Sequence, residues 1–373
     1  MDRTGPCFAL QPRMRVTLRT FATAAWLCIA ASADAQILAV AGRVTDAQTG
    51  QPLSGASVFC QNTTIGTTTS AEGAFRLALP DGGYDLVVSF NGYDTYSARI
   101  GKGSDAAETL EVRLKLKDRS LEEVTVVASN EVRDGWKKYG SLFRDQFLGM
   151  TEGVDSCIIE NIDSLRFFYS RKRDRLKVVA REPLRIRNEA LGYRIRYELD
   201  SFTHEFGSGN TEYAGYALFE EMEGDDARQA LWKERRKDAY FGSMLHFMRC
   251  YYDSTLALNG YRLERVDPAT GKSKLIYDPY DSTFFEAFDD GEAMLVSNGR
   301  LRVTYSQEPP DARYLRSKGM PEKTPVQISI LQFPVAVVIE QNGYYHDQKD
   351  ILASGYWAWE KLAMLVPYDY DPD

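Results

Sequence analysis

The chain has 373 residues, of which 44% are apolar and 26% charged, and its formal net charge is −8. This balance is typical of globular domains and excludes a fibrous or disordered chain, while the length indicates two or three domains. The acidic balance also excludes a general electrostatic affinity for nucleic acid, so no nucleic-acid partner is expected.

The N-terminus has the pattern of a secretory signal peptide. An arginine-bearing stretch, Arg13–Arg19, precedes a short apolar run over 21–32, and Ala33-Asp34-Ala35 follows as an A-x-A cleavage site. The run is too short to span a membrane. We therefore expect residues 1–35 to be removed on export, with an uncleaved N-terminal anchor as the alternative. No later stretch is apolar enough for a spanning helix, so none is expected in the mature chain.

The next region, up to residue 117, alternates between apolar and polar side chains in short runs. Examples are Ala56–Phe59, Phe75–Leu79 and Tyr84–Ser89, which are separated by turns rich in Gly, Asp and Ser. Short strands with a turn signal every 8–12 residues or so predict a β-sandwich. Cys60 continues the inward alternation of the first run, so we expect it to pack in the core as a small hydrophobe.

Three segments of this region carry a family resemblance: Gly42–Val58 (GRVTDAQTGQPLSGASV), Thr67–Pro80 (TTTSAEGAFRLALP) and Tyr84–Tyr93 (YDLVVSFNGY). They resemble the carboxypeptidase regulatory-like domain of the transthyretin (prealbumin) type. The resemblance implies a seven-stranded antiparallel β-sandwich over residues 36–117 that is non-catalytic and serves as a stabilising or docking module.

Residues 118–130 are expected to be a connector. Arg119–Ala128 (RSLEEVTVVA) is similar to a segment that follows the same domain in starch-utilisation-type TonB-dependent receptors, where it leads into a plug and barrel. No plug-like sequence follows here. Later stretches such as Gly135–Gly149 and Gly355–Pro367 instead resemble exported bacterial proteins named only after their first domain, a resemblance that implies no activity.

Residues 131–373 are predicted to form a β-rich α+β domain, which makes the whole chain mainly β. Trp136–Phe147 has helical spacing, and one long helix is predicted from a cap at Asp225 or Asp226 to about Tyr252, so at about 226–252. Alternation predicts strands at Leu165–Tyr169, Leu176–Ala180, Leu184–Ile186, Tyr193–Leu199, Phe202–Phe206, Ser273–Tyr277, Leu301–Ser306, Val326–Leu331, Val335–Ile339 and Gly355–Trp359.

The sequence lacks the motifs of the common hydrolases. The histidines, His204, His246 and His346, do not have the spacing of a zinc site, and Gly207-Ser208-Gly209 is typical of a hairpin turn rather than a nucleophile elbow. We therefore predict no catalytic residues, no metal and no cofactor. Paired carboxylates for glycoside hydrolysis stay open in an acidic chain, as does a Cys157–Cys250 disulfide.

One stretch departs from the acidic background. Residues 165–200 carry a net charge of +6, and on strands Arg185 and Arg187 share one face, as do Arg194 and Arg196. One hypothesis is a cationic surface for an anionic envelope polymer or an acidic partner. The alternative is a solvated face whose arginines pair with acids elsewhere.

A second feature is the aromatic group formed by Tyr356, Trp357 and Trp359. If 355–359 is a strand, the two tryptophans share one face, where they would form a platform for sugar rings. Core packing is the alternative, because aromatic side chains dominate cores by area.

Together these features predict an exported, non-catalytic protein of the cell envelope, in the periplasm or associated with the outer membrane of a Gram-negative bacterium. Its expected role is binding or assembly, with an envelope protein or glycan as partner. The alternative is a hydrolase that acts on envelope polymers through an unrecognised site in the C-terminal domain.

Overall fold

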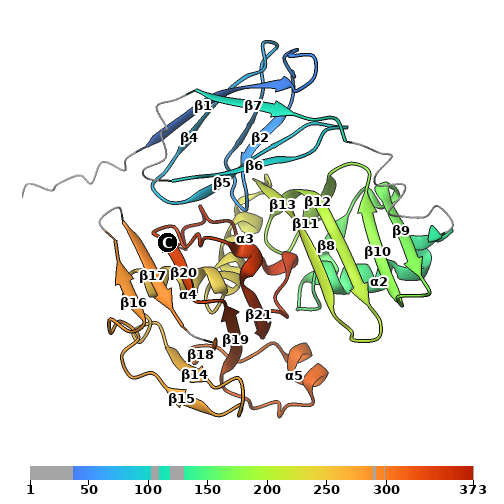
Figure 1. The fold of residues 1–373 in the computed structure, drawn as a ribbon. Coiled ribbons are helices and arrows are strands. Elements are labelled where there is room, and N and C mark those ends of the chain that lie inside the picture. The colour runs from blue at the N-terminus through green and yellow to red at the C-terminus, as the bar shows by residue number, and fades with distance from the viewer. Residues whose placement is uncertain (1–36, 102–108, 118–129, 289–290, 298, 373) are drawn as a thin grey trace, which may run out of the picture. The chain divides into compact units, whose positions relative to one another are not determined.

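The computed structural model of the chain describes residues 37–101, 109–117, 130–288, 291–297 and 299–372. The predicted signal peptide at 1–35 lies outside these residues, as does nearly all of the connector. The described chain is mainly β, as predicted (Figure 1).

Seven strands form the N-terminal sandwich, in two sheets of order β4-β1-β7 and β3-β2-β5-β6. Their bounds are β1 (Leu38–Asp46), β2 (Ser57–Cys60), β3 (Gly66–Thr68), β4 (Ala74–Leu79), β5 (Tyr84–Ser89), β6 (Tyr96–Ile100) and β7 (Leu110–Leu114). The inward-facing side chains, such as Val44, Val58 and Leu86, are fully buried and form one core, which includes Cys60 as predicted. One pairing differs from the antiparallel expectation: β7 runs parallel to β1. Because β7 arrives from the other sheet rather than through a hairpin, it is free to take this direction.

The region that follows forms a six-stranded antiparallel sheet with a helix, α2 (Gly135–Phe147), against it (Figure 1). The strands are β8 (Cys157–Ile159), β9 (Leu165–Ser170), β10 (Arg175–Ala180), β11 (Leu184–Asn188), β12 (Tyr193–Glu205) and β13 (Thr211–Glu221). Helix α2 packs through Phe143, 4.8 Å between ring centroids from Phe202, and through Phe147, 4.9 Å from Tyr197. The hairpin turn at Gly207–Gly209 is confirmed, with Gly209 N–H donating to the carbonyl of Glu205 at its base.

Strand β12 joins the two strands predicted at Tyr193–Leu199 and Phe202–Phe206. A bulge lies between Leu199 and Ser201. The extra residue reverses the inward alternation, so that Tyr193 and Tyr197 before it and Phe202 after it all face the core. The prediction of two strands was wrong because a bulge changes the apolar–polar alternation in the same way as the end of one strand and the start of the next.

The single helix predicted at about 226–252 is also wrong, because the structure divides it into α3 (Asp226–Tyr240) and α4 (Met244–Tyr252). Gly242, with φ of +82°, interrupts the helical path, and the Ser243 side chain then caps α4 by accepting from His246 N–H. The cap predicted at Asp225 is confirmed, with its carboxylate accepting from Arg228 N–H.

Two further sheets complete the chain, a five-stranded one of order β15-β14-β18-β19-β21 and a three-stranded one of order β16-β17-β20. The strands are β14 (Tyr261–Val266), β15 (Ser273–Leu275), β16 (Phe285–Ala287), β17 (Glu292–Val296), β18 (Gly299–Tyr305), β19 (Gln327–Phe333), β20 (Ala336–Glu340) and β21 (Leu352–Gly355), with helix α5 (Ala312–Lys318) between β18 and β19. The strand predicted at Gly355–Trp359 is wrong: β21 ends at Gly355, φ +78°, and a turn follows in which Trp359 N–H donates to Tyr356 O.

The sandwich is tied to the rest of the chain by the turn after β2. Asn62 N–H donates to Ala217 O on β13, and Asn62 O accepts from Tyr368 N–H near the C-terminus, both at 2.7 Å. The Asp369 carboxylate also accepts from the backbone N–H and the hydroxyl of Thr64. Backbone pairing therefore places the turn between β13 and the C-terminal segment.

Replacing Asp369 with Ala is expected to lower the free energy of unfolding by about 1 kcal/mol, because two donors of the exposed Thr64 lose a charged acceptor. Urea unfolding measures this loss. Glu111, exposed on β7, is a matched control whose replacement by Ala should change stability by no more than about 0.5 kcal/mol. An Asp369 variant as stable as the control would contradict the prediction.

Candidate functional site

The four candidate arginines of the cationic surface form one group. Arg185 and Arg187 on β11 lie directly opposite Arg196 and Arg194 on β12. Since directly opposed residues and residues two apart share a face, all four side chains leave the same side of the sheet.

Acidic side chains form ion pairs with most of the arginines on this face. Arg187 bonds to Glu160 at 3.0 Å and also to Glu189, and a further ion pair joins Arg185 to Glu182 at 3.6 Å. The fourth pair, Arg196–Glu198 at 2.9 Å, lies against the sandwich, where Ser89 donates to the same glutamate at 2.7 Å. For Arg194 no ion pair is found among the described residues, so its charge is the least compensated of the four arginines.

The candidate aromatic residues do not share a strand face. Trp357 is 7% exposed; its ring packs on Phe247, and its indole N–H donates to Gly242 O at 2.8 Å, where α3 and α4 separate. Tyr356 and Trp359, also buried, pack instead on Tyr314 of α5. The strand on which the platform depended is a turn, and its aromatics are divided between two clusters.

The three histidines lie apart and have different partners. His204 Nδ1 bonds to Thr211 Oγ1 at 2.7 Å, and His246 Nδ1 accepts from Gly242 N–H at 3.2 Å and bonds to Tyr261 Oη at 3.0 Å. His346 lies beside two carboxylates and forms a group with Glu292 and Glu340, in which the nearest ligand atoms are within 4.8 Å of one another.

The group around His346 has the ligand types of a metal site, but its hydrogen bonds oppose one. The Arg99 guanidinium lies 2.8 Å from His346 Nδ1, and since arginine only donates, Nδ1 must carry the lone pair. The proton is then on Nε2, which faces Glu340 at 3.2 Å. A metal on Nε2 would require the opposite tautomer, with Nδ1–H pointing at a donor. The geometry fits a neutral histidine that links Arg99 of the sandwich to Glu340.

The three cysteines that the structure describes do not offer a nucleophile. Cys60, Cys157 and Cys250 are free and buried, so the disulfide left open by the sequence is not formed. Burial raises the pKa of the Cys60 and Cys157 thiols to about 12 and that of Cys250 to about 11. Thiols with such pKa values stay protonated near neutrality.

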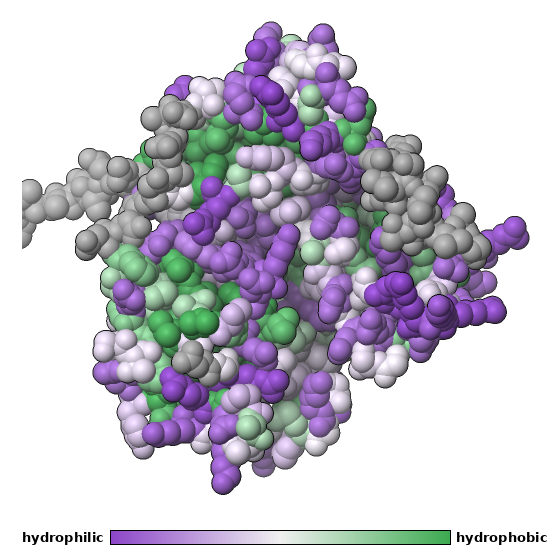
Figure 2. Space-filling model, in the orientation of Figure 1, coloured by the Kyte–Doolittle hydropathy of each residue, from purple (hydrophilic) through white to green (hydrophobic). Residues whose placement is uncertain are grey.

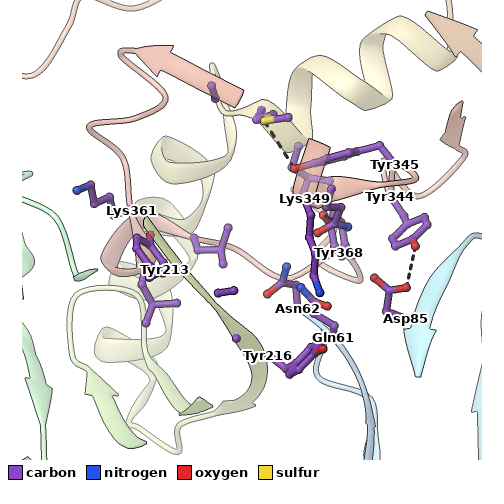
Figure 3. A pocket seen from close by; sticks show the side chains of 18 of the residues that line it. Gln61, Asn62, Asp85, Tyr213, Tyr216, Tyr344, Tyr345, Lys349, Lys361 and Tyr368 are labelled. Carbon is purple, nitrogen blue, oxygen red and sulfur yellow. Dashed lines mark hydrogen bonds between the residues drawn. The ribbon is translucent and has the colours of Figure 1, made fainter. Parts of the chain in front are cut away.

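The best candidate site is an open cavity of about 830 Å³ that the sandwich lines together with later parts of the chain. Its walls come from the turn after β2 with β5 and β6, from β12 and β13, from the start of α4, and from 344–368. Figure 2 shows a hollowed centre surrounded by hydrophilic residues, and Figure 3 shows Gln61, Asn62 and Tyr216 reaching into the space. The volume lies within the roughly 300–1,000 Å³ typical of ligand sites.

Side-chain contacts hold the sandwich wall of the cavity in place. Tyr344 donates from its hydroxyl to Asp85 on β5 at 2.9 Å (Figure 3), and Asn342 Nδ2 donates to Gly83 O at 3.0 Å. Gly83 permits this approach, since a Cβ there would lie 2.6 Å from both Glu340 and Tyr344. Burial raises the pKa of the Asp85 carboxyl, and the Tyr344 hydrogen bond opposes that shift.

Tyrosines dominate the interior of the cavity. Tyr197 on β12 is only 6% exposed and Tyr213 on β13 is partly buried, and neither hydroxyl has a hydrogen-bond partner in the described parts of the chain. Burial raises the pKa of Tyr197 well above its usual value and that of Tyr213 to about 12. Both phenols therefore keep their protons and remain available as donors and acceptors.

A neighbouring pair of ionisable residues has pKa values displaced toward neutrality. Burial, with the nearby Glu308 and Asp311 charges, raises the pKa of Glu360 to about 8. Burial lowers the pKa of Lys361 to about 8, and its ammonium donates to Gln146 O at 2.8 Å. A protonated Glu360 is a neutral hydrogen-bond donor in the cavity wall.

Sequence reasoning did not single out Tyr197 or Tyr213 as site residues. Both lie on strands whose alternation marks them as inward-facing, which is the pattern of core residues. The cavity forms where side chains from segments far apart in the sequence leave the space between them unfilled, and a local pattern carries no signal for that.

Comparison with known proteins identifies the first domain. Residues 40–126 match the family model of the CarboxypepD_reg-like domain. The chain therefore carries a CarboxypepD_reg-like domain, and the resemblance drawn from Gly42–Tyr93 is confirmed.

Two curated relatives match the N-terminal part of the chain. The TonB-dependent receptor P3 of Formosa agariphila is 29% identical over 131 residues, 35% of this chain and 12% of the receptor. The TonB-dependent receptor SusC of Bacteroides thetaiotaomicron is 35% identical over 109 residues, 29% of this chain and 10% of that receptor. The chain thus matches about a tenth of the length of either receptor, and these relatives are consistent with an envelope-associated role.

Among solved structures, a 9R-lipoxygenase from Cyanothece PCC8801 aligns with 60% of this chain and 49% of its own, at 10% identity and a TM-score of 0.16. That score is too low to carry any conclusion. Within the described ranges, no helix combines the length and the hydropathy needed to cross a membrane.

Proposed function

We propose that the protein is a non-catalytic binding protein of the Gram-negative cell envelope, exported to the periplasm or the outer membrane. Its ligand, an envelope glycan or a segment of an envelope protein, would occupy the cavity that the sandwich lines with the C-terminal domain. The observation that carries the proposal is this shared cavity of about 830 Å³, in which the phenol groups of Tyr197 and Tyr213 have no hydrogen-bond partner among the described residues.

The receptor relatives support the location. Two TonB-dependent receptors carry a segment similar to this N-terminal domain, which favours a role at the envelope for the chain. Here the sandwich contributes one wall of the cavity through Asp85 and Arg99, so its proposed role is to shape a binding site rather than to act alone.

The arginine face supports a ligand site less well. Ion pairs already occupy Arg185, Arg187 and Arg196, and the last of these contacts the sandwich. A ligand there would have to displace the acids that already pair with these arginines. The cavity instead offers the hydroxyls of Tyr197 and Tyr213, for which the described residues provide no partner.

Photo-crosslinking in the native envelope tests the proposal. A photoreactive amino acid at Ala214, in the cavity wall, is expected to capture a specific glycan or protein adduct. The same amino acid at Tyr277, 90% exposed and outside the cavity, is the control and should not capture it. Absence of any adduct specific to Ala214 would overturn the proposal.

One observation favours the alternative, a hydrolase of envelope polymers. A carboxyl group with a pKa raised to about 8, such as Glu360, has the protonation state of a general acid and lies at the cavity. Release of labelled fragments from envelope polymers by the protein, lost on replacing Glu360 with Gln while binding persists, would support the hydrolase. Binding without release supports the binding protein.

A further inference from the structure

We infer that the ligand of this cavity is an uncharged saccharide, an inference that rests on the proposed binding function and specifies the class of its ligand. Three properties of the cavity lead to it: unpartnered hydroxyl groups, nearly balanced charge, and aromatic surface beside polar groups.

The hydroxyl groups of Tyr197 and Tyr213 are the first property. A phenol both donates and accepts one or more hydrogen bonds, and a sugar hydroxyl does the same, so the two groups satisfy each other in either direction. Tyr197 is 6% exposed and its hydroxyl has no partner in the described chain, so this group is available to a ligand or to water in the cavity. Gln61 and Asn62, on the turn from the sandwich, add amide groups that donate and accept (Figure 3).

The charge of the cavity is the second property. The wall holds three basic side chains, Arg99, Lys349 and Lys361, and five acidic ones, Asp85, Asp200, Asp347, Asp350 and Glu360, of which burial raises the pKa of Glu360 to about 8. Arg99 is occupied by His346, and the Lys361 ammonium by Gln146. Acidic side chains slightly outnumber basic ones, which disfavours an anionic polymer, and the three basic side chains disfavour a strongly cationic peptide. A neutral ligand avoids both penalties.

Aromatic side chains provide the third property. Tyr216 and Tyr345 line the same space as the carboxylate of Asp200. Their rings supply apolar surface for the C–H faces of a sugar, and carboxylate and phenol groups accept from its hydroxyls. A purely apolar ligand would leave these polar groups without partners.

Calorimetric titration of the whole mature protein tests the inference. The probes are neutral glucose-, mannose- and galactose-based oligosaccharides, with matched uronic acid oligosaccharides as the charged arm. At least one neutral oligosaccharide is expected to bind, and the uronates are expected to bind at least tenfold more weakly. Replacing Tyr213 with Phe should weaken neutral binding roughly tenfold, because one hydrogen bond of about 1–1.5 kcal/mol is lost and the ring is kept. Tyr277→Phe, an exposed control, should leave binding unchanged.

The outcomes separate this inference from the proposed function. Preference for uronates, no binding of any saccharide, or unchanged affinity of Tyr213→Phe with an unchanged unfolding temperature would each overturn the saccharide inference. Crosslinking from Ala214 would still report a non-saccharide ligand in that case, and the proposed function would survive. If neither saccharide binding nor an adduct specific to Ala214 is observed, both the saccharide inference and the proposed function are overturned.

Discussion

Replacing Arg249 with Ala is expected to lower the free energy of unfolding by about 3–5 kcal/mol and to release the C-terminal segment. Arg249 on α4 donates to the carbonyls of Asn342 at 3.0 Å, Tyr370 at 2.9 Å and Tyr368 at 2.8 Å. A hydrogen bond from a charged donor contributes about 1.5–3 kcal/mol, and the three are lost together, though not additively. Because Tyr368 lines the cavity, ligand binding should fall as well.

Urea unfolding and amide exchange at Tyr368 measure the two effects of this replacement. The Tyr368 N–H donates to Asn62 O, so its exchange reports whether the C-terminal segment still pairs with the sandwich turn. Arg262→Ala is the control, because its side chain is 60% exposed and its nearest acid, Glu264, is 3.9 Å away; a change under about 1 kcal/mol is expected. Unchanged exchange at Tyr368 in Arg249→Ala would show that the segment is held by other contacts.

Acidification is expected to cost the folded protein roughly 3 kcal/mol through His246 alone. Burial, helped by the nearby Arg249 charge and opposed by a hydrogen bond to Asn259, lowers the pKa of this histidine from 6.5 to about 4. Its Nδ1 accepts from Gly242 N–H and lies 3.0 Å from Tyr261 Oη, contacts that fit the neutral ring. The folded pKa lies below the unfolded one, so the contribution is fully present above about pH 6.5 and is lost as the pH falls to about 4.

The difference between the wild type and His246→Gln isolates this effect. Glu308 and Glu360, with pKa values raised to about 7 and 8, change stability in the opposite direction, because the folded state holds their protons more tightly. Both acids are present in either protein, so their effects cancel in the difference. Urea unfolding between about pH 7 and pH 4 should show the stability advantage of the wild type shrinking. A difference independent of pH would mean that His246 does not titrate in this range.

The sandwich was predictable because its strands and turns are marked by short patterns of neighbouring residues. Alternating runs such as Phe75–Leu79 and Tyr84–Ser89 match the observed strands, and the turn residues between them are of the required types. Strand β6 (Tyr96–Ile100), short and half-exposed, was implied by the family resemblance rather than by its pattern. Helix α2 and most later strands were likewise visible as alternation or helical spacing.

The candidate site was predictable only in part, because it depends on contacts between distant residues. The sequence placed Arg185 with Arg187 on one strand face and Arg194 with Arg196 on another. It did not reveal that the two pairs lie opposite each other, or that Glu160 and Glu198 pair with them. Trp357 reads as a surface aromatic if a strand is assumed, whereas its indole N–H bonds 115 residues away to Gly242. The cavity itself depends on the pairing of Asn62 with β13 and the C-terminal segment, which no local pattern encodes.

A crystal structure of the protein with the tightest-binding neutral oligosaccharide tests the central claim most directly. The prediction is density for the sugar within the cavity, with its hydroxyls within hydrogen-bond distance of Tyr197 and Tyr213. Density for the sugar outside the cavity, for example over Arg187 and Arg194, with the two tyrosines untouched, would contradict it.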